Sequence, residues 1–301
     1  MLDVCLLGCG GMMPLPGRWL TALMLRYNGK SLLIDCGEGT QIAIREKGWG
    51  MKAIDTIAIT HLHADHISGL PGLLLSMGHS GRTEPLTMIG PARLPETVAA
   101  LRSIAPEIPF PIEFKVVSGA EETLDWNGCA LKVFRVSHGM PCYGYSVTLP
   151  RAGKFDPARA AAIPRIYWKK LQQGETVTDG GRTYSPADVL GPERVGLKVT
   201  YCTDSRPVPA IAENAKNADL FICEGMYGDP AKQDKAIENM HMMFEEAARL
   251  AQAAQPKAMW LTHYSPSLSD PMEHIALARA IFPRTEPGEN GMTAVLRFDG
   301  R

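Results

Sequence analysis

A run of β-type apolar residues leads directly into a cluster of metal-binding residue types. The strand candidate IDTIAIT (residues 54–60) is followed by His61, His63, Asp65 and His66, so three of the chain's eight histidines lie within six positions. Residues i and i+2 lie on one face of an extended segment. His61 and His63 can therefore share one metal ion. Asp65 and His66 fall past the strand end, where the turn can direct them to a second position nearby.

Three further donors stand where other predicted strands end. His138 ends VFRVSH, Asp204 lies in VTYCTDS, and His263 ends MWLTH. Imidazole and carboxylate groups are ligands that Zn²⁺ and related divalent ions prefer. A carboxylate has two oxygens, so Asp204 is the natural bridge between two ions. The whole set predicts a site for two metals about 3.5–4 Å apart that can hold an attacking water.

Strand-like runs alternate with helical patterns along most of the chain. Asn28-Gly29 and Asn127-Gly128 each separate two apolar runs, which predicts two β-hairpins. Residues 151–194 interrupt this rhythm with proline, glycine and charge, so we predict an inserted arm with its base there. Two β-rich halves with helices between and after them predict an α/β fold, a four-layer αββα sandwich formed by one domain over residues 1–301.

The composition is that of an ordinary globular protein, with 45% hydrophobic and 21% charged residues. No apolar run approaches the ~20 residues that a membrane helix needs, so we expect no membrane partner. The first residues lack the basic n-region of a signal peptide, and the seven scattered cysteines form no CxxC pair. We therefore expect a reduced, cytoplasmic protein.

One segment departs from the net charge of −1, which gives no overall attraction to nucleic acid. Residues 151–170 carry six basic residues against one acidic residue. This charge can be a solvated face. On RNA, Arg165, Lys169 and Lys170 would meet phosphates while the neighbouring aromatic residues 167 and 168 stack on bases. Alternatively, these two aromatic side chains pack the arm onto the body or onto a second subunit.

Several quoted motifs carry a resemblance to a known family. LLGCGG, LLIDCGEGTQ, THLHADHISGLPGLL, VSHGMPCYGYSV and LTHYSP resemble the metallo-β-lactamase superfamily over essentially the whole chain. More narrowly, their order and neighbours resemble the ribonuclease Z family of tRNA 3′-end endonucleases. The stretch from Lys169 to Pro192 favours this family, which carries a similar sequence at the base of its substrate-binding arm.

The resemblance implies a division of roles among the candidate residues. It implies two Zn²⁺ ions per chain, with Mn²⁺ as an alternative metal. One ion would be held by His61, His63 and His138 and the other by Asp65, His66 and His263. Asp204 would bridge the two. Asp65 would orient the water, and Glu224 paired with His241 would protonate the leaving oxygen. Arg18, in the early loop PLPGRW, would steady phosphate charge. The family also implies a homodimer in which one arm serves the partner's site.

Two other functions remain open at this point. The same chemistry could act on a small phosphodiester, a sulfate ester or a cyclic nucleotide instead of a tRNA precursor. The chain could also be a catalytically silent relative that binds RNA or protein. The complete set of seven metal donors argues against this last reading, whereas nothing in the sequence cleanly separates the first two.

Overall fold

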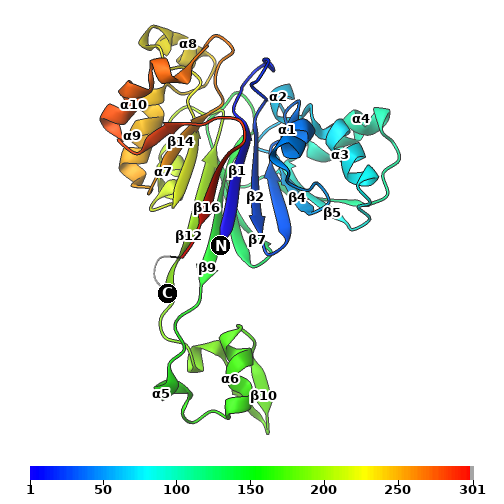
Figure 1. Cartoon of the computed structure of the whole chain (residues 1–301), viewed down its shortest axis with the longest axis vertical. Helices are drawn as coiled ribbons and strands as arrows, with labels where there is room; N and C mark the ends of the chain where they lie inside the picture. The colour runs from blue at the N-terminus through cyan, green and yellow to red at the C-terminus, as the bar shows by residue number, and fades with distance from the viewer. Residues whose placement is uncertain (299–301) are drawn as a thin grey trace. The chain divides into compact units, whose positions relative to one another are not determined.

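The computed structural model describes residues 1–298, which form two compact units. One unit contains Met1–Thr148 and the chain from Lys198 onward, and the other contains Leu149–Leu197. The chain enters the second unit through β9 (Tyr143–Arg151) and leaves it through β12 (Arg194–Cys202), which are neighbours in one sheet (Figure 1).

Within the described residues, the first unit contains two seven-stranded sheets. The first sheet has the order β16 (Met292–Leu296), β1 (Leu2–Gly8), β2 (Ala22–Tyr27), β3 (Lys30–Ile34), β4 (Ile54–Ala58), β5 (Leu86–Pro91) and β6 (Ile112–Val117). The second sheet has the order β15 (Thr285–Pro287), β14 (Met259–Thr262), β13 (Leu220–Glu224), β12, β9, β8 (Cys129–Arg135) and β7 (Glu121–Trp126). The last strand of the chain thus pairs with the first, which the local sequence pattern does not predict.

Helices cover the outer faces of both sheets (Figure 1). Those beside the first sheet are α1 (Thr40–Lys47), α2 (Ala64–Ile67), α3 (Leu70–His79) and α4 (Leu94–Leu101). Those beside the second are α7 (Pro209–Ala215), α8 (Gln233–Glu238), α9 (Phe244–Ala254) and α10 (Ile275–Ile281). Short 3-10 helices are η1 (Arg102–Ile104), η2 (Pro186–Asp188), η3 (Pro230–Lys232) and η4 (Pro271–Glu273). The predicted four-layer sandwich is confirmed.

Turn chemistry and apolar burial explain why these elements form. Asn28-Gly29 joins β2 to β3 and Asn127-Gly128 joins β7 to β8, and all four residues have positive φ, as tight hairpin turns demand. Strands β3 to β6 pair in parallel. Strands β3, β4 and β5 are rich in buried apolar residues because both their faces are covered, whereas the edge strand β6 is largely exposed. The carboxyl ends of β12, β13 and β14, which also pair in parallel, meet at one edge of the second sheet.

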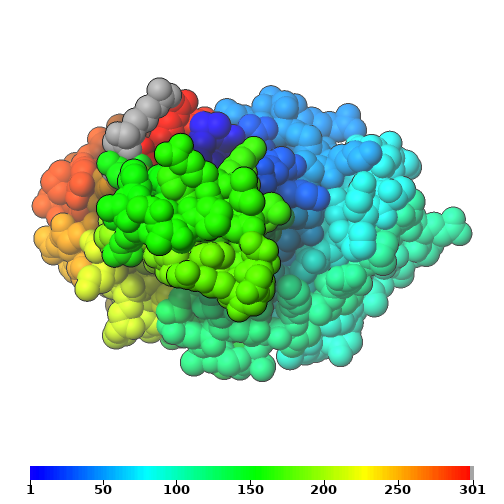
Figure 2. All heavy atoms as spheres, turned by 90° about the horizontal axis from the view of Figure 1, so that it is seen from below, coloured from blue at the N-terminus to red at the C-terminus, as the bar shows by residue number. Residues whose placement is uncertain are grey.

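The second unit has a small core of its own and is the green body in Figure 2. It contains α5 (Pro157–Ala160), α6 (Arg165–Gln172), β10 (Val177–Asp179) and β11 (Arg182–Tyr184). Tyr167 and Trp168 both pack against this core, and the indole N–H of Trp168 donates to the carbonyl of Ile163 at 2.9 Å. These two rings therefore pack within the arm itself.

Among the helices that the structure describes, none combines the length and the apolar character needed to span a membrane.

Candidate metal centre

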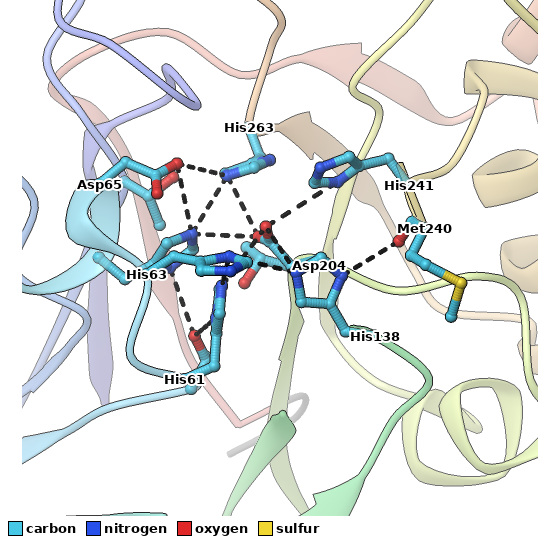
Figure 3. Close-up of polar contacts among 12 residues, drawn as sticks. His61, His63, Asp65, His138, Asp204, Met240, His241 and His263 are labelled. Atoms are coloured by element: carbon cyan, nitrogen blue, oxygen red, sulfur yellow. Dashed lines mark hydrogen bonds and ion pairs between the residues drawn. The ribbon is translucent and has the colours of Figure 1, made fainter. Parts of the chain in front are cut away.

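Three histidines and one aspartate converge from separate segments of the first unit (Figure 3). His61 and His63 follow β4, His138 follows β8, and Asp204 follows β12. His63 Nδ1 lies 2.9 Å from His61 Nε2 and 3.3 Å from His138 Nε2. Oδ2 of Asp204 lies 3.6 Å from His61 Nε2 and 3.9 Å from His138 Nε2. The i and i+2 histidines thus meet, as the extended spacing predicts.

A second group of donors lies on the other side of Asp204. The Nε2 atoms of His66 and His263 are 3.2 Å apart, and Oδ2 of Asp65 lies 3.7 Å from the first and 3.3 Å from the second. Asp65 and His66 come from α2, and His263 follows β14. Oδ1 of Asp204 is 3.1 Å from both imidazole nitrogens. Each oxygen of Asp204 therefore faces a different group of donors.

The electrostatics of the cluster suit a bound cation. Burial lowers the pKa values of His61, His63 and His138, so these imidazoles are neutral and keep lone pairs for a metal. Burial opposes ionisation of Asp204, but neighbouring histidines hold its pKa well below the usual range. For His66, burial likewise opposes the charged form, yet Asp204 and Asp35 raise its pKa well above normal, so a metal ion bound there would displace a proton from this ring.

The donor chemistry fits divalent metal ions. Neutral imidazole nitrogens pointing at one another at 2.9–3.3 Å, around buried carboxylates, are stabilised by positive charge placed between them. Two sets of donors whose ligand atoms lie within 4.8 Å of one another provide such places, one with His61, His63, His138 and Asp204, the other with Asp65, His66 and His263. These residues could hold two ions.

A buried carboxylate that the sequence reasoning missed supports the second group. Asp35, after β3, has a positive φ of 61° and accepts from the backbone N–H of Thr60 at 2.8 Å. Its Oδ2 lies 2.9 Å from His66 Nδ1, which leaves Nε2 of His66 facing the cluster. A carboxylate on the far nitrogen of a ligating histidine fixes the ring orientation. Its only sequence signal was an acidic residue at the end of an apolar strand.

Close backbone approach requires glycine at two positions beside the site. A Cβ on Gly37 would lie 2.4 Å from the carbonyl oxygen of Asp65, and one on Gly11 would lie 2.7 Å from the ring of His263. Next to Gly11, Met12 adopts a left-handed conformation with φ of 67°, and its N–H donates to Asp65 Oδ2 at 2.7 Å. Met12 is a second contact to the site that the sequence reasoning missed.

The Glu224–His241 pair is formed beside the donor cluster. Glu224 is fully buried at the end of β13, and its Oε2 lies 3.0 Å from Nδ1 of His241. Burial disfavours the imidazolium, but Glu224 overrides it and raises the pKa of His241 to about 9. His241 Nδ1 is also 3.9 Å from Asp204 Oδ2, so the pair adjoins both metal groups (Figure 3).

The predicted substrate-binding residues lie in two places. Arg18 belongs to the loop before β2, where its guanidinium donates to the carbonyls of Leu268 at 2.7 Å and Ser269 at 2.9 Å. Arg165, Lys169 and Lys170 are exposed on α6 of the second unit. The structure therefore brings together the seven metal donors and the Glu–His pair, while the three basic residues belong to the separate arm unit.

Two family models and several known proteins match the sequence of this chain. A family model described as anti-Pycsar protein Apyc1 matches residues 2–155, and one described as a β-lactamase superfamily domain matches residues 172–264. The chain is 57% identical to ribonuclease Z of Lachnoclostridium phytofermentans and to that of Lachnospira eligens, over 99% of each chain in both cases.

Solved structures resemble this fold over nearly its whole length. The short form of human tRNase Z superposes with a TM-score of 0.72 at 24% identity, over 98% of this chain and 100% of that one. A long form of RNase Z from yeast superposes with a TM-score of 0.64 at 15% identity, over 97% of this chain and 41% of that one. At these identities the likeness shows the metallo-β-lactamase fold.

Proposed function

The chain belongs to the ribonuclease Z family of the metallo-β-lactamase superfamily, and we propose that it removes the 3′ trailer from tRNA precursors. It is a metal-dependent hydrolase of the endoribonuclease class. The full-length relatives decide the family, because they align over 99% of the chain whereas the anti-Pycsar family model ends at residue 155. The cut would leave a 3′-hydroxyl on the tRNA and a 5′-phosphate on the trailer.

The observation that carries this proposal is the convergence of seven metal donors beside a buried Glu–His pair. We propose two Zn²⁺ ions per chain, with Mn²⁺ as the alternative, held by His61, His63 and His138 on one side, Asp65, His66 and His263 on the other, and Asp204 between them. When bound, the ions would lower the pKa of a water molecule and neutralise charge on the phosphate.

Asp65 is suited to orient the attacking water. Side-chain interactions with His263 and His66 overcome the effect of burial and hold the pKa of Asp65 far below its usual value, so the carboxylate stays ionised. The N–H of Met12 fixes its Oδ2 at 2.7 Å. The second carboxylate oxygen can accept a hydrogen bond from the water and direct its lone pair toward the phosphorus.

His241 is suited to protonate the leaving 3′-oxygen of the tRNA. Its Nδ1 donates to Glu224, so Nε2 is the nitrogen that can pass a proton to the substrate. Arg18 would contribute on the substrate side. A guanidinium carries five N–H groups, so its bonds to Leu268 and Ser269 leave others for a phosphate oxygen.

A two-substrate assay tests this function against the small-ester alternative. Purified, metal-replete protein is incubated with a 3′-extended tRNA precursor and, separately, with bis-p-nitrophenyl phosphate. We expect a single cut at the 3′ side of the acceptor stem, with kcat/KM far higher for the precursor. Turnover of the small ester with no cleavage of the precursor would instead favour a small-molecule phosphodiesterase.

The basic face of α6 should govern precursor binding. Replacing Arg165, Lys169 and Lys170 together by Ala should raise KM for the precursor by about 10-fold. It should also lower the slope of log KM against log salt by up to about three, because each phosphate contact contributes about one to that slope. Point substitutions are preferable to deletion, since residues 160 and 163 belong to the arm's core. Steady-state kinetics from low to high salt measure both effects.

The matched control removes the same charge from the first unit. Lys30, Arg45 and Lys52 are exposed there, and their triple Ala variant should leave KM unchanged. An equal rise in KM for both variants would point to net charge and not to a binding face on the arm. Turnover of bis-p-nitrophenyl phosphate should be the same in both.

We also propose a homodimer in which one chain's arm serves its partner's site. Family membership supports this arrangement. At precursor concentrations well below KM, mixing an Asp204→Ala chain, which keeps its arm, with the α6 triple variant, which keeps its site, should raise the cleavage rate above the sum of the two separate proteins if the arm acts in trans. A cytoplasmic location is proposed as well, and the seven free, buried cysteines fit a reducing compartment.

A further inference from the structure

The loop that carries His241 is held through its backbone carbonyls. This loop, residues 239–243, joins α8 to α9. The Met240 carbonyl accepts from His138 Nδ1 at 3.3 Å, and the Met242 carbonyl accepts from the N–H of Met226 at 3.1 Å. Between them, the carbonyl of His241 itself accepts a short hydrogen bond from the guanidinium of Arg206.

Arg206 is held in turn by a carboxylate from the next helix. Its Nη1 lies 2.9 Å from Oε2 of Glu246, and its Nη2 pairs closely with Oε1, which makes a two-point ion pair. Glu246 also accepts the N–H of Met243 at 2.9 Å, at the start of α9. The side chains of Arg206 and Glu246 are only 20% and 12% exposed. A partly buried, bidentate pair of this kind is much stiffer than a surface ion pair.

The segment Asp204–Arg206 therefore touches both members of the acid pair. The N–H of Ser205 donates to Oε1 of Glu224, and Arg206 binds the backbone of His241. The same segment is anchored to residue 137, whose carbonyl accepts from the N–H of Arg206 at 2.8 Å. Asp204 faces both donor groups, and the two residues after it, Ser205 and Arg206, contact the Glu224–His241 pair.

We propose that Arg206, clamped by Glu246, is a positioning residue that fixes His241 for proton transfer to the leaving oxygen. This inference rests on the proton-donor role proposed for His241. Glu246 and the carbonyl of His241 engage three of the five N–H groups of Arg206, and this side chain is only 20% exposed, which favours a positioning role over contact with the substrate. Lysine cannot replace it, since one ammonium cannot span two carboxylate oxygens and a carbonyl in the same planar geometry.

The test compares Arg206→Lys and Glu246→Gln with the wild type on two substrates. On a 3′-extended tRNA precursor, Arg206→Lys should lower kcat by about 10- to 100-fold with little change in KM, the cost of displacing a catalytic group by about 1 Å. On bis-p-nitrophenyl phosphate, whose leaving group departs without a proton, the loss should be several-fold smaller. Glu246→Gln keeps the shape of the clamp and should show a weaker form of the same pattern.

Three readouts separate positioning from mere structural damage. In a His241→Ala background, Arg206→Lys should cause no further loss on the precursor, because the two residues act through one proton transfer. Metal content should remain that of the wild type. Arg249→Lys is the matched control and should retain wild-type kinetics, because Arg249 lies on α9, as Glu246 does, but pairs with Glu245 at 3.6 Å.

Specific outcomes would overturn the proposal. Equal losses on both substrates, loss of metal, or additive losses with His241→Ala would each exclude it. If Arg206→Lys does not fold, Glu246→Gln decides the matter by the same criteria. If His241→Ala loses the same activity on both substrates, the proton-donor role of His241 fails. If His241→Ala loses more on the precursor but Arg206→Lys and Glu246→Gln have no effect, only the positioning role of Arg206 is refuted.

Discussion

Asp204→Ala is expected to lose most bound metal and at least about 10³-fold of precursor cleavage. Among residues 1–298, Asp204 is the one residue whose two oxygens face both donor groups, with Oδ1 at 3.1 Å from His66 and His263 and Oδ2 at 3.6 Å from His61. Removing it leaves each group with imidazoles and, on one side only, Asp65. The charge stabilisation that metal ions give to phosphate chemistry, worth several kcal/mol, would be lost with them.

Elemental analysis of protein purified with excess Zn²⁺ measures this prediction directly. The wild type should carry about two ions per chain, since seven donors overfill one four-coordinate site. Asp35→Asn should be intermediate, because it leaves every direct donor in place but removes the carboxylate behind His66, and such changes cost about 10- to 100-fold in metal affinity.

A buried aspartate away from the cluster provides the matched control. Asp219, directly before β13, accepts from the N–H of Lys198 at 2.7 Å, so Asp219→Ala removes a buried carboxylate without touching the donors. This variant should lose stability and keep its metal. An Asp204→Ala protein that still holds two ions per chain would refute the bridging position of this residue.

The convergence of the candidate metal donors could be predicted from sequence because their chemistry and their places in the strand pattern coincide. Four of these residues cluster in the motif HLHADH, and a sandwich brings the ends of other apolar runs, with their histidines and aspartates, toward them. The hairpins at residues 28–29 and 127–128 were predictable for a similar reason, since Asn-Gly dictates positive φ locally.

Residues that act through distant partners could not be found this way. Asp35 gains its proposed role from contact with His66, 31 positions away, and Arg206 gains its proposed role from contact with Glu246, 40 positions away. Neither carries a local signal stronger than an ordinary charged residue. The same holds for β16, whose pairing with β1 joins opposite ends of the chain. Non-local pairing is fixed by the packed fold and not by the local pattern.

The arm shows the opposite difficulty, because a suggestive local pattern had two physical explanations. Aromatic residues among cations suit RNA stacking as well as they suit a small core. In the structure the half-buried Trp168 packs against Phe155, with ring centroids 5.0 Å apart, and the cations of α6 are exposed. Phosphate contact by the cations is therefore the testable part of the arm's proposed role.

His241→Ala and Glu224→Gln should each slow precursor cleavage by about 10²- to 10⁴-fold, the usual range for general acid catalysis. A ribose 3′-alkoxide is a poor leaving group and needs a proton, whereas p-nitrophenolate departs readily without one. The same variants should therefore lose far less on bis-p-nitrophenyl phosphate. The double variant should be little worse than either single one, because the carboxylate acts through the imidazole.

The raised pKa of His241 predicts the direction in which precursor cleavage changes with pH. Glu224 raises the pKa of His241 to about 9, and the proton donor must be protonated, so precursor cleavage should fall as pH rises through that range. Glu224→Gln removes the charge that favours the imidazolium, which should move this alkaline limb to lower pH; His241→Ala should abolish it.

Metal content must be measured alongside, since Glu224 Oε2 also lies 3.9 Å from His263. His79→Ala, at the exposed end of α3, is the control with no expected effect. Equal losses on both substrates, or loss of metal in His241→Ala, would place His241 in the metal or substrate shell and not in proton transfer.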